Sequence, residues 1–290
     1  MIKGSMVAIV TPFKGGNLDE EGLRELIEFQ IENGTDAIVP CGTTGESATL
    51  THKEHDRVID IVVNQVNGRV PVIAGTGSNN TSEATRLTRH AKDAGANAVL
   101  MIAPYYNRPT QEGIYLHFKQ VAEKVSIPII LYNIASRTGV NMMPETVFRL
   151  AKIDNIVGIK EASGSLGQVS EIINLCGDKF SVVSGDDILT LPIMSVGGMG
   201  AISTVANVAP ADLSGLYDSF IKGDMEKARE LHHKLLPLIN GMFLETNPIP
   251  VKSALSLMGK ISGELRLPLS TMAEKNLIKL KKIMASYGLI

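Results

Sequence analysis

Residues 128–160, PIILYNIASRTGVNMMPETVFRLAKIDNIVGIK, contain the unit that decides the fold. The stretch begins with the apolar run Pro128–Tyr132 and ends with a second run, Ile156–Lys160, which has the length and β-branched content of a buried strand. Between them, Pro144–Ala151 shows a helical pattern. A strand, a helix and a second strand in this order predict parallel pairing through a right-handed crossover.

The same unit recurs along most of the chain. The other predicted strands are Met6–Val10, Asp36–Pro40, Pro71–Ala74, Ala98–Ala103, Phe180–Ser184 and Gly200–Ser203. Predicted helices between them include Leu18–Glu32, His52–Val66, Thr81–Ala94, Gln111–Lys124 and Ala211–Lys222. The strands lack polar alternation, as expected when both faces are covered. Eight strand–helix units predict an α/β fold, a (β/α)8 TIM barrel, with a doubly wound open sheet as the alternative.

The barrel is expected over residues 1–223, and residues 224–290 are expected to add three helices as a C-terminal extension. A net charge of −2 gives no electrostatic reason to expect nucleic acid or an acidic membrane as a partner. No apolar stretch approaches 18 residues, and the N-terminus enters a predicted strand too early for a signal peptide. With only two cysteines, Cys41 and Cys176, these features predict a cytoplasmic protein.

Polar residues cluster directly after the predicted strands, where a barrel places its active site. These clusters are Cys41–Glu46, Pro104–Asn107, Tyr132–Asn133 with Ser136–Gly139, Lys160, Ser184–Asp187 and Ser203–Thr204. Lys160 is the most informative of these residues. An ammonium group that ends an interior strand in an apolar cavity is poorly solvated, so its pKa falls and the neutral amine becomes a nucleophile toward carbonyls. The alternative is a lysine that simply reaches water.

Three neighbours of Lys160 suggest supporting chemistry. Tyr132, at an adjacent strand end, is placed to pass protons to and from a lysine-bound intermediate, although a core tyrosine is the plainer interpretation. The Gly42–Gly45 turn offers amides and two hydroxyls for a carboxylate, or is an ordinary strand-to-helix turn. Arg137, in a short polar loop, suits bidentate capture of a second carboxylate, or is a surface arginine.

Other motifs are weaker. Gly197–Gly200 resembles a phosphate cradle but precedes a strand, at the wrong end of the barrel. His52 and His55 have metal-ligand spacing but no third ligand, so we expect no metal site. Cys41 lies at the right end for a nucleophile, but no histidine is near it in the sequence.

The chain resembles the pyruvate-dependent, Schiff-base class I aldolases and lyases over nearly its whole length, from Val7–Pro12 to Asn247–Lys252. Within this family it is most similar to the members that form a dihydrodipicolinate ring. The motifs that carry the resemblance are Gly42–Ser47, Pro104–Asn107, Leu131–Asn133, Gly158–Glu161 and Ser184–Asp187.

The resemblance implies a lyase that joins pyruvate to L-aspartate 4-semialdehyde, the committed step of diaminopimelate and lysine biosynthesis. Lys160 would form an imine with pyruvate, so that no metal or other cofactor is needed, and Tyr132 would act as general acid/base. Thr43 would relay protons between Tyr132 and Tyr106, which would reach in from a neighbouring subunit. Thr44 would hold the pyruvate carboxylate.

The resemblance also assigns roles outside the reacting centre. Arg137 would bind the carboxylate of the second substrate, and Gly185 and Ile202 would line the pocket. Residues of the family's lysine feedback site are present as Ser47, Ala48, His52, His55, Asn79, Glu83 and Tyr105. The expected partners are the two small substrates, L-lysine as an effector, and further copies of the chain in a homo-oligomer, expected to be a tetramer.

Sister activities are the nearest alternatives. N-acetylneuraminate lyases and 2-keto-3-deoxy-sugar-acid aldolases share the lysine and the tyrosine but typically read Gly-Ser-Thr-Gly and lack the arginine, so Thr43 and Arg137 favour the dihydrodipicolinate-forming activity. A metal-dependent aldolase would need a ligand set that the sequence does not show. A barrel that only binds a small ligand is disfavoured by the joint presence of Lys160, Tyr132 and Thr43.

Overall fold

Short parallel strands and helices alternate through residues 2–290, which the computed structural model describes. The chain folds as the predicted (β/α)8 barrel, and helices follow at its C-terminal end. In this range the parallel strands are β1 (Gly4–Ala8), β4 (Ala37–Val39), β5 (Ile73–Gly75), β6 (Ala98–Ile102), β7 (Ile129–Asn133), β8 (Ile156–Glu161), β9 (Ser181–Ser184) and β10 (Gly200–Ser203). The α-helices are α1 (Glu20–Glu32), α2 (His52–Val66), α3 (Thr81–Ala94), α4 (Gln111–Lys124), α5 (Ala135–Thr138), α6 (Pro144–Leu150), α7 (Leu166–Cys176), α8 (Thr190–Ser195), α9 (Pro210–Ile221), α10 (Met225–Gly241), α11 (Ile249–Leu257) and α12 (Glu274–Tyr287). Three short 3-10 helices are η1 (Ser47–Thr49), η2 (Asp187–Leu189) and η3 (Val205–Asn207).

The chain divides into two compact units, each of which is described by itself. The first unit comprises Pro71–Ile202 with the residues before Ser5, and the second comprises Ser5–Val70 and Ser203–Ile290. The first unit therefore contains Lys160 and Tyr132, and the second contains the Gly42–Gly45 turn. The boundary between residues 223 and 224 stays a prediction.

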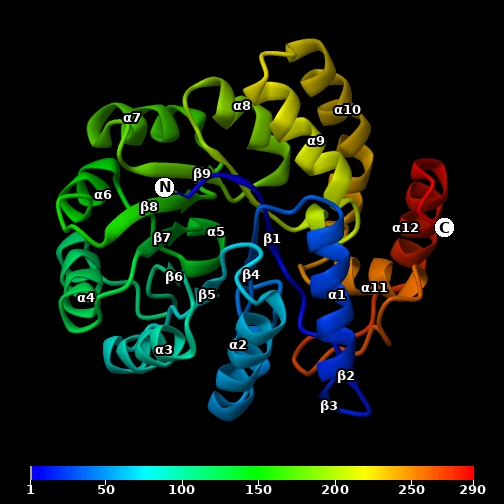
Figure 1. The fold of residues 1–290 in the computed structure, drawn as a ribbon, viewed down its shortest axis with the longest axis horizontal. Coiled ribbons are helices and arrows are strands. Elements are labelled where there is room, and N and C mark those ends of the chain that lie inside the picture. The colour runs from blue at the N-terminus through cyan, green and yellow to red at the C-terminus, as the bar shows by residue number, and fades with distance from the viewer. Residues whose placement is uncertain (1) are drawn as a thin grey trace. The chain divides into compact units, whose positions relative to one another are not determined.

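Strands β5–β9 of the first unit lie side by side in chain order. Helices α3, α4, α6 and α7 lie on their outer side (Figure 1). Every residue of β7 is buried, which explains why the strand is so apolar. The parallel register of β7 and β8 places Tyr132 opposite Lys160 and Asn133 opposite Glu161. Two predicted functional residues therefore meet at neighbouring strand ends.

The second unit contains the pair of parallel strands β1 and β4, with Val7 opposite Ile38. It also contains the C-terminal helices, in which α10 packs on both α9 and α12, and α11 packs on α12. The three predicted helices after residue 224 are thus present as α10, α11 and α12. No helix within residues 2–290 combines the length and apolar character needed to cross a membrane.

The first strand is displaced from its predicted position. It was expected at Met6–Val10 and lies at Gly4–Ala8. The amide of Val10 donates to the side-chain oxygen of Asn207 at 3.1 Å instead of to a neighbouring strand. A side chain distant in the sequence therefore ends the strand ladder, although the apolar run continues.

The first helix also begins later than predicted. Leu18 was expected to start it but belongs to β3 (Asn17–Leu18), which pairs with β2 (Phe13–Lys14) in a short antiparallel hairpin. Asp19 then caps α1 by accepting a hydrogen bond of 3.0 Å from the amide of Gly22. An aspartate cap satisfies an amide that lacks a partner in the first turn, so the helix starts at Glu20.

Candidate active site

Lys160 and Tyr132 form the centre of the site in the first unit. Each residue is only 6% exposed, and the Lys160 ammonium nitrogen lies 4.5 Å from the centre of the Tyr132 ring. Burial lowers the pKa of Lys160 to about 8, with Asp187 opposing the shift and Arg137 adding to it. At pH 7 roughly one amine in ten is then neutral, against roughly one in three thousand for an ordinary lysine. The structure therefore places a lysine with a raised neutral fraction beside a phenol, as a nucleophilic amine would require.

Gly185 lies directly against the Lys160 side chain. A Cβ atom at this position would be 2.9 Å from the lysine Cε and 2.9 Å from the Ala162 Cβ, closer than real Cβ contacts. Only glycine therefore leaves room for the extended lysine. Ile202, on β10, is buried.

A buried carboxylate follows Lys160 on the same strand. Glu161 accepts hydrogen bonds from the Ser163 amide at 2.6 Å, from the Asn133 side-chain amide at 3.1 Å and from Gln168 at 3.2 Å. These donors satisfy the carboxylate without a cation, as a buried acidic group requires. The network ties the ends of β7 and β8 together. Sequence reasoning assigned no role to these residues, although Asn133 and Glu161 directly follow Tyr132 and Lys160 at the two strand ends.

The sequence predicted that Arg137 lies in a short loop, and this prediction is wrong. Arg137 lies in the single-turn helix α5, which ends at Gly139 with a φ of +74°. Glycine adopts this left-handed conformation without steric cost, so the chain reverses immediately after the arginine. Arg137 is exposed, yet its charge contributes to lowering the pKa of Lys160.

The Gly42–Gly45 turn belongs to the second unit. Its threonines differ in exposure: Thr43 is partly exposed and Thr44 is buried. The Thr44 hydroxyl oxygen accepts a hydrogen bond of 3.0 Å from the Asn247 side chain and lies 3.5 Å from the Thr204 hydroxyl. Asn247 is a site contact that sequence reasoning missed, because it comes from more than 200 residues away.

Residues of the predicted lysine site occur in both units. In the first, the Asn79 side chain donates to the Tyr105 carbonyl at 3.2 Å, and Ser78 donates to the Glu83 carboxylate. Burial, and the charge of Glu83, raise the pKa of the Tyr105 phenol. In the second unit, His55 of the predicted lysine site is buried. The other three residues of that site in this unit are partly or fully exposed: Ser47, Ala48 and His52.

Three other sequence features are placed as follows. Cys41 is buried, and burial together with Asp56 raises the pKa of its thiol well above its usual range, which disfavours a nucleophilic thiolate. Among the residues that the structure describes, no group of three or more His, Cys, Asp or Glu side chains is arranged to hold a metal ion, and His52 and His55 belong to no such group.

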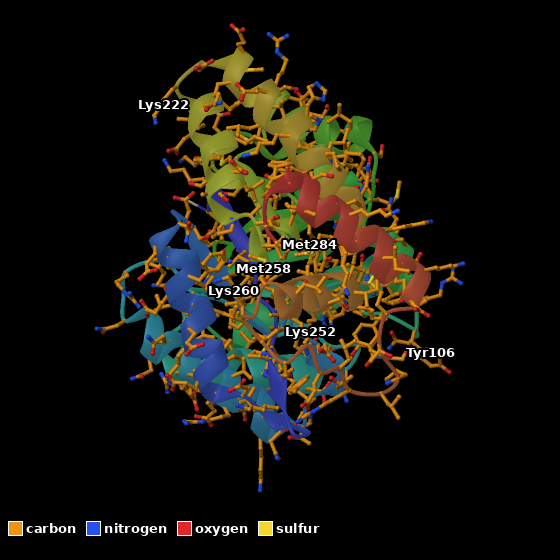
Figure 2. The ribbon with its side chains drawn as sticks, turned by 90° about the vertical axis from the view of Figure 1, so that its right-hand side faces the viewer. Tyr106, Lys222, Lys252, Met258, Lys260 and Met284 are labelled. Carbon is orange, nitrogen blue, oxygen red and sulfur yellow. The ribbon has the colours of Figure 1, made fainter. Side chains whose placement is uncertain are left out.

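The side chain of Tyr106 is 90% exposed (Figure 2).

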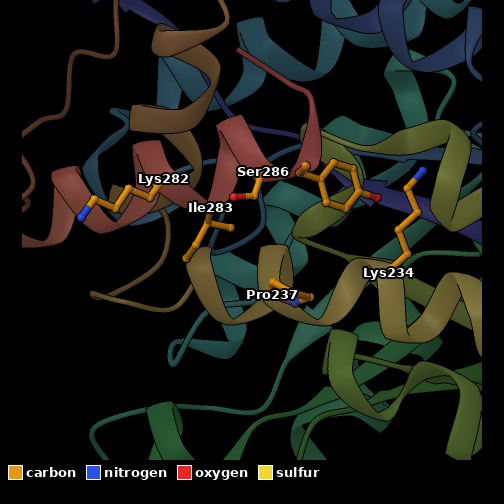
Figure 3. A pocket seen from close by; sticks show the side chains of 6 residues that line it. Lys234, Pro237, Lys282, Ile283 and Ser286 are labelled. Carbon is orange, nitrogen blue, oxygen red and sulfur yellow. The ribbon is translucent and has the colours of Figure 1, made fainter.

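A cavity of about 350 Å³ lies between α10 and α12 of the second unit (Figure 3). It contains none of the predicted catalytic or substrate-binding residues. Its lining residues are Lys234, Pro237, Lys282, Ile283, Ser286 and Tyr287.

Comparison with known proteins decides the family. The model of the dihydrodipicolinate synthetase family matches residues 1–287. The chain belongs to the dihydrodipicolinate synthetase family. It is 66% identical to the 4-hydroxy-tetrahydrodipicolinate synthase of Syntrophus aciditrophicus, over the full length of both chains. The enzymatic activity predicted from the sequence, that of a 4-hydroxy-tetrahydrodipicolinate synthase and hence a lyase, is thereby confirmed.

Solved structures of the family share the fold. The chloride-inhibited dihydrodipicolinate synthase of Acinetobacter baumannii, complexed with pyruvate, is 47% identical and superposes with a TM-score of 0.98 over all of both chains. The enzyme of Cyanidioschyzon merolae, solved with lysine bound, is 40% identical, with a TM-score of 0.97 over 99% of each chain.

Proposed function

We propose that Lys160 is the residue through which this enzyme of the dihydrodipicolinate synthetase family binds pyruvate covalently. The observation that carries the proposal is the buried position of Lys160 against the Tyr132 ring, with a pKa of about 8. The neutral amine attacks the keto carbon of pyruvate, and loss of water leaves a protonated imine. Loss of a methyl proton then gives an enamine, with the imine nitrogen accepting the electron pair.

The second half of the reaction forms two bonds. The enamine carbon attacks the aldehyde carbon of L-aspartate 4-semialdehyde, and the aldehyde oxygen takes up a proton. The amino group of this substrate then attacks the imine carbon, closes the ring and displaces Lys160 as an amine. The protonated imine is itself the electron acceptor, so the proposed chemistry requires no metal. Chelator-treated enzyme should keep its activity.

Tyr132 is proposed as the general acid/base. Its ring is held beside the Lys160 nitrogen by the register of β7 and β8. A phenol next to the reacting atoms can give a proton to the departing hydroxyl of the carbinolamine and to the aldehyde oxygen. Thr43 is proposed to carry protons to and from the site, and Tyr106 to complete the path.

The remaining residues are proposed to position the substrates. Thr44 is proposed to hold the pyruvate carboxylate through its hydroxyl and amide, and Gly185 and Ile202 to line the pocket. Arg137 is exposed, and its guanidinium is proposed to bind the carboxylate of L-aspartate 4-semialdehyde through two parallel hydrogen bonds.

Two further proposals concern the assembly of the enzyme and its regulation. An exposed Tyr106 is proposed to act in the site of a neighbouring copy within a homotetramer. L-lysine is proposed as an effector bound by the residues around Glu83 and Tyr105, in keeping with the lysine-bound relative from Cyanidioschyzon merolae.

The Schiff-base step is tested by adding pyruvate and borohydride. We expect a reduced pyruvyl group on the peptide that contains Lys160, and no such mass on the Lys160→Ala variant. Lys179, an exposed lysine of the same unit, supplies a control peptide that should stay unmodified. Unmodified Lys160 in active enzyme would contradict the mechanism. Turnover with L-aspartate 4-semialdehyde, compared with cleavage of sialic acid, tests the substrate.

A further inference from the structure

A fully buried ion pair joins the C-terminal helices to the strand-end turn of the second unit. The Lys252 ammonium nitrogen lies 2.5 Å from a Glu46 carboxylate oxygen, and both side chains are 0% exposed. The same nitrogen lies 4.3 Å from the centre of the Phe13 ring. Burial lowers the pKa of Lys252, whereas the nearby Glu46 carboxylate raises it. A buried pair of this kind leaves a costly unpaired charge when either partner is removed.

Glu46 directly follows the Gly42–Gly45 turn and has an unusual backbone. Its φ of +52° and ψ of +36° are left-handed, and Cys41, which precedes the turn, has a φ of +56°. Residues with a Cβ atom pay an energetic cost in this conformation and keep it only where their surroundings hold them. Both boundaries of the turn are therefore held by contacts outside it.

Helix α11 and the residue Asn247 just before it contact the turn and the residue that follows it. Lys252 lies on α11 (Figure 2) and holds Glu46. Asn247, just before the helix, donates to the Thr44 hydroxyl oxygen at 3.0 Å. A short segment, from Asn247 to Lys252, therefore contacts both the residue after the turn and the threonine inside it.

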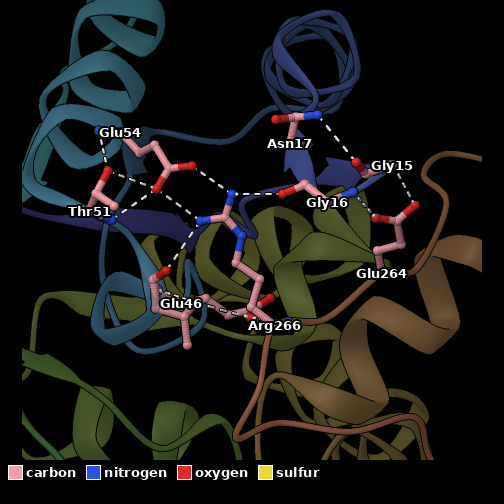
Figure 4. A network of polar contacts seen from close by, with 9 residues as sticks. Gly15, Gly16, Asn17, Glu46, Thr51, Glu54, Glu264 and Arg266 are labelled. Carbon is pink, nitrogen blue, oxygen red and sulfur yellow. Dashed lines mark hydrogen bonds and ion pairs between the residues drawn. The ribbon is translucent and has the colours of Figure 1, made fainter.

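Arg266 adds a third anchor (Figure 4). Its backbone amide donates to Glu46 at 3.3 Å, while its guanidinium makes two bonds, of 2.6 and 2.9 Å, to Glu54 near the start of α2. The guanidinium also donates to the Thr49 carbonyl at 3.2 Å. The segment after the turn is thus fixed from both the C-terminal region and α2.

We propose that Lys252, acting through its ion pair with Glu46, is a positioning residue for the pyruvate-binding turn. The ion pair fixes Glu46 in its left-handed conformation and thereby sets the direction of the Thr44 hydroxyl and amide. The C-terminal helices then contribute to substrate binding as well as to stability. This inference rests on the proposed role of Thr44 in holding the pyruvate carboxylate.

The test measures the pyruvate concentration that gives half-maximal borohydride trapping on Lys160. We expect Lys252→Met and Glu46→Gln to raise this concentration at least tenfold, while the rate at saturating pyruvate falls less than threefold. The double variant Glu46→Gln/Lys252→Met leaves no unpaired buried charge, so it should regain thermal stability but not pyruvate affinity. A purely structural pair predicts that stability and affinity recover together, and that result would overturn the proposal.

Two controls make the result specific. Leu235→Ala opens a cavity in the buried face of α10, so it should lower stability without changing the half-saturating concentration. Glu20→Gln breaks the exposed ion pair with Arg57 and should change neither quantity. If the Lys252→Met and Glu46→Gln variants do not fold, Glu46→Asp, which keeps the charge but shortens the side chain that reaches Lys252, should raise the concentration about threefold. An unchanged value in this folded variant would also overturn the proposal.

Failure of the inference differs from failure of the proposed function. Absence of trapping in the wild-type enzyme would contradict the imine at Lys160. Normal trapping in the wild type, with unaltered pyruvate affinity in folded variants, would contradict only the positioning role of Lys252.

Discussion

The ammonium nitrogen of Lys160 lies 4.5 Å from the centre of the Tyr132 ring, and the two residues are directly opposite each other in neighbouring parallel strands. A cation over an aromatic face gains roughly 1 kcal/mol. This gain does not make up for the loss of hydration, since the pKa of Lys160 is still lowered to about 8. The contact therefore holds the nitrogen in place but does not offset the desolvation that favours the neutral amine.

The rate of imine formation should depend on pH in the way this pKa dictates. In the proposed mechanism only the neutral amine attacks pyruvate, so the rate should rise about tenfold per pH unit below pH 8 and level off above it. The rate of borohydride trapping at saturating pyruvate between pH 6 and pH 9.5 measures this. A midpoint near 10.5, the ordinary value for lysine, would show that burial does not tune Lys160.

Two neighbours should move that midpoint in opposite directions. Asp187 raises the pKa of Lys160 and Arg137 lowers it. Asp187→Asn should therefore shift the midpoint of the trapping rate to lower pH, and Arg137→Gln should shift it to higher pH. Arg149→Gln, which removes an exposed arginine paired with Glu112, is the matched control and should leave the midpoint in place. Shifts of the same sign in both variants would contradict the electrostatic explanation.

Much of the barrel could be predicted because its signals are local. Apolar runs and helical patterns depend on neighbouring residues, and β10 and helices α2, α3 and α4 have the predicted bounds. Parallel pairing of consecutive strands then brings Tyr132 and Lys160 together without further information. The single-turn helix that carries Arg137 was missed because four residues are too few to show a helical period.

The contacts that hold the second unit's turn could not be predicted. Asn247 lies 203 residues from Thr44, and Lys252 lies 206 residues from Glu46. A lysine on a predicted helix is ordinarily assigned to the surface, because lysine is rarely buried. No periodic signal links a single polar side chain to its partner across the fold, so these pairings appear only in the structure.

Replacing Lys160 by methionine should abolish trapping but stabilise the fold. The pKa of Lys160 is about 8 in the folded enzyme and near 10.5 when unfolded, so the unfolded chain binds more protons between these pH values. The lysine therefore destabilises the fold fully below pH 8, and this penalty disappears as pH rises toward 10.5. We expect Lys160→Met to raise the free energy of unfolding by roughly 1–3 kcal/mol at pH 7, with a smaller gain at pH 10, measured by urea unfolding. Lys160→Arg keeps the charge and should give no gain.

The carboxylate of Glu161 should make Asn133 intolerant of a negative charge. Asn133 is buried and donates to Glu161 at 3.1 Å. Asn133→Asp places two buried carboxylates together and removes a donor, so we expect a loss of about 2–4 kcal/mol in the free energy of unfolding at pH 7. Part of this loss should be recovered near pH 5, where one carboxylate takes up a proton. Asn17→Asp, at an exposed position, should cost little at either pH; equal losses in the two variants would contradict this interpretation.

Tyr106 is 90% exposed and has a left-handed φ of +69°, so the chain presents its phenol outward at the loop after β6. If the phenol serves a neighbouring copy, Tyr106→Phe should lower kcat about tenfold or more, as loss of a proton-transfer group does. Mixing Tyr106→Phe chains with inactive Lys160→Ala chains should then restore activity, because a mixed oligomer contains one site with both an intact lysine and a partner's intact tyrosine. A mixture of Tyr132→Phe and Lys160→Ala chains is the control and should stay inactive if both residues serve the site of their own chain. If Tyr106→Phe and Lys160→Ala chains are shown to exchange subunits and activity is still not restored, Tyr106 does not act in the site of a neighbouring copy.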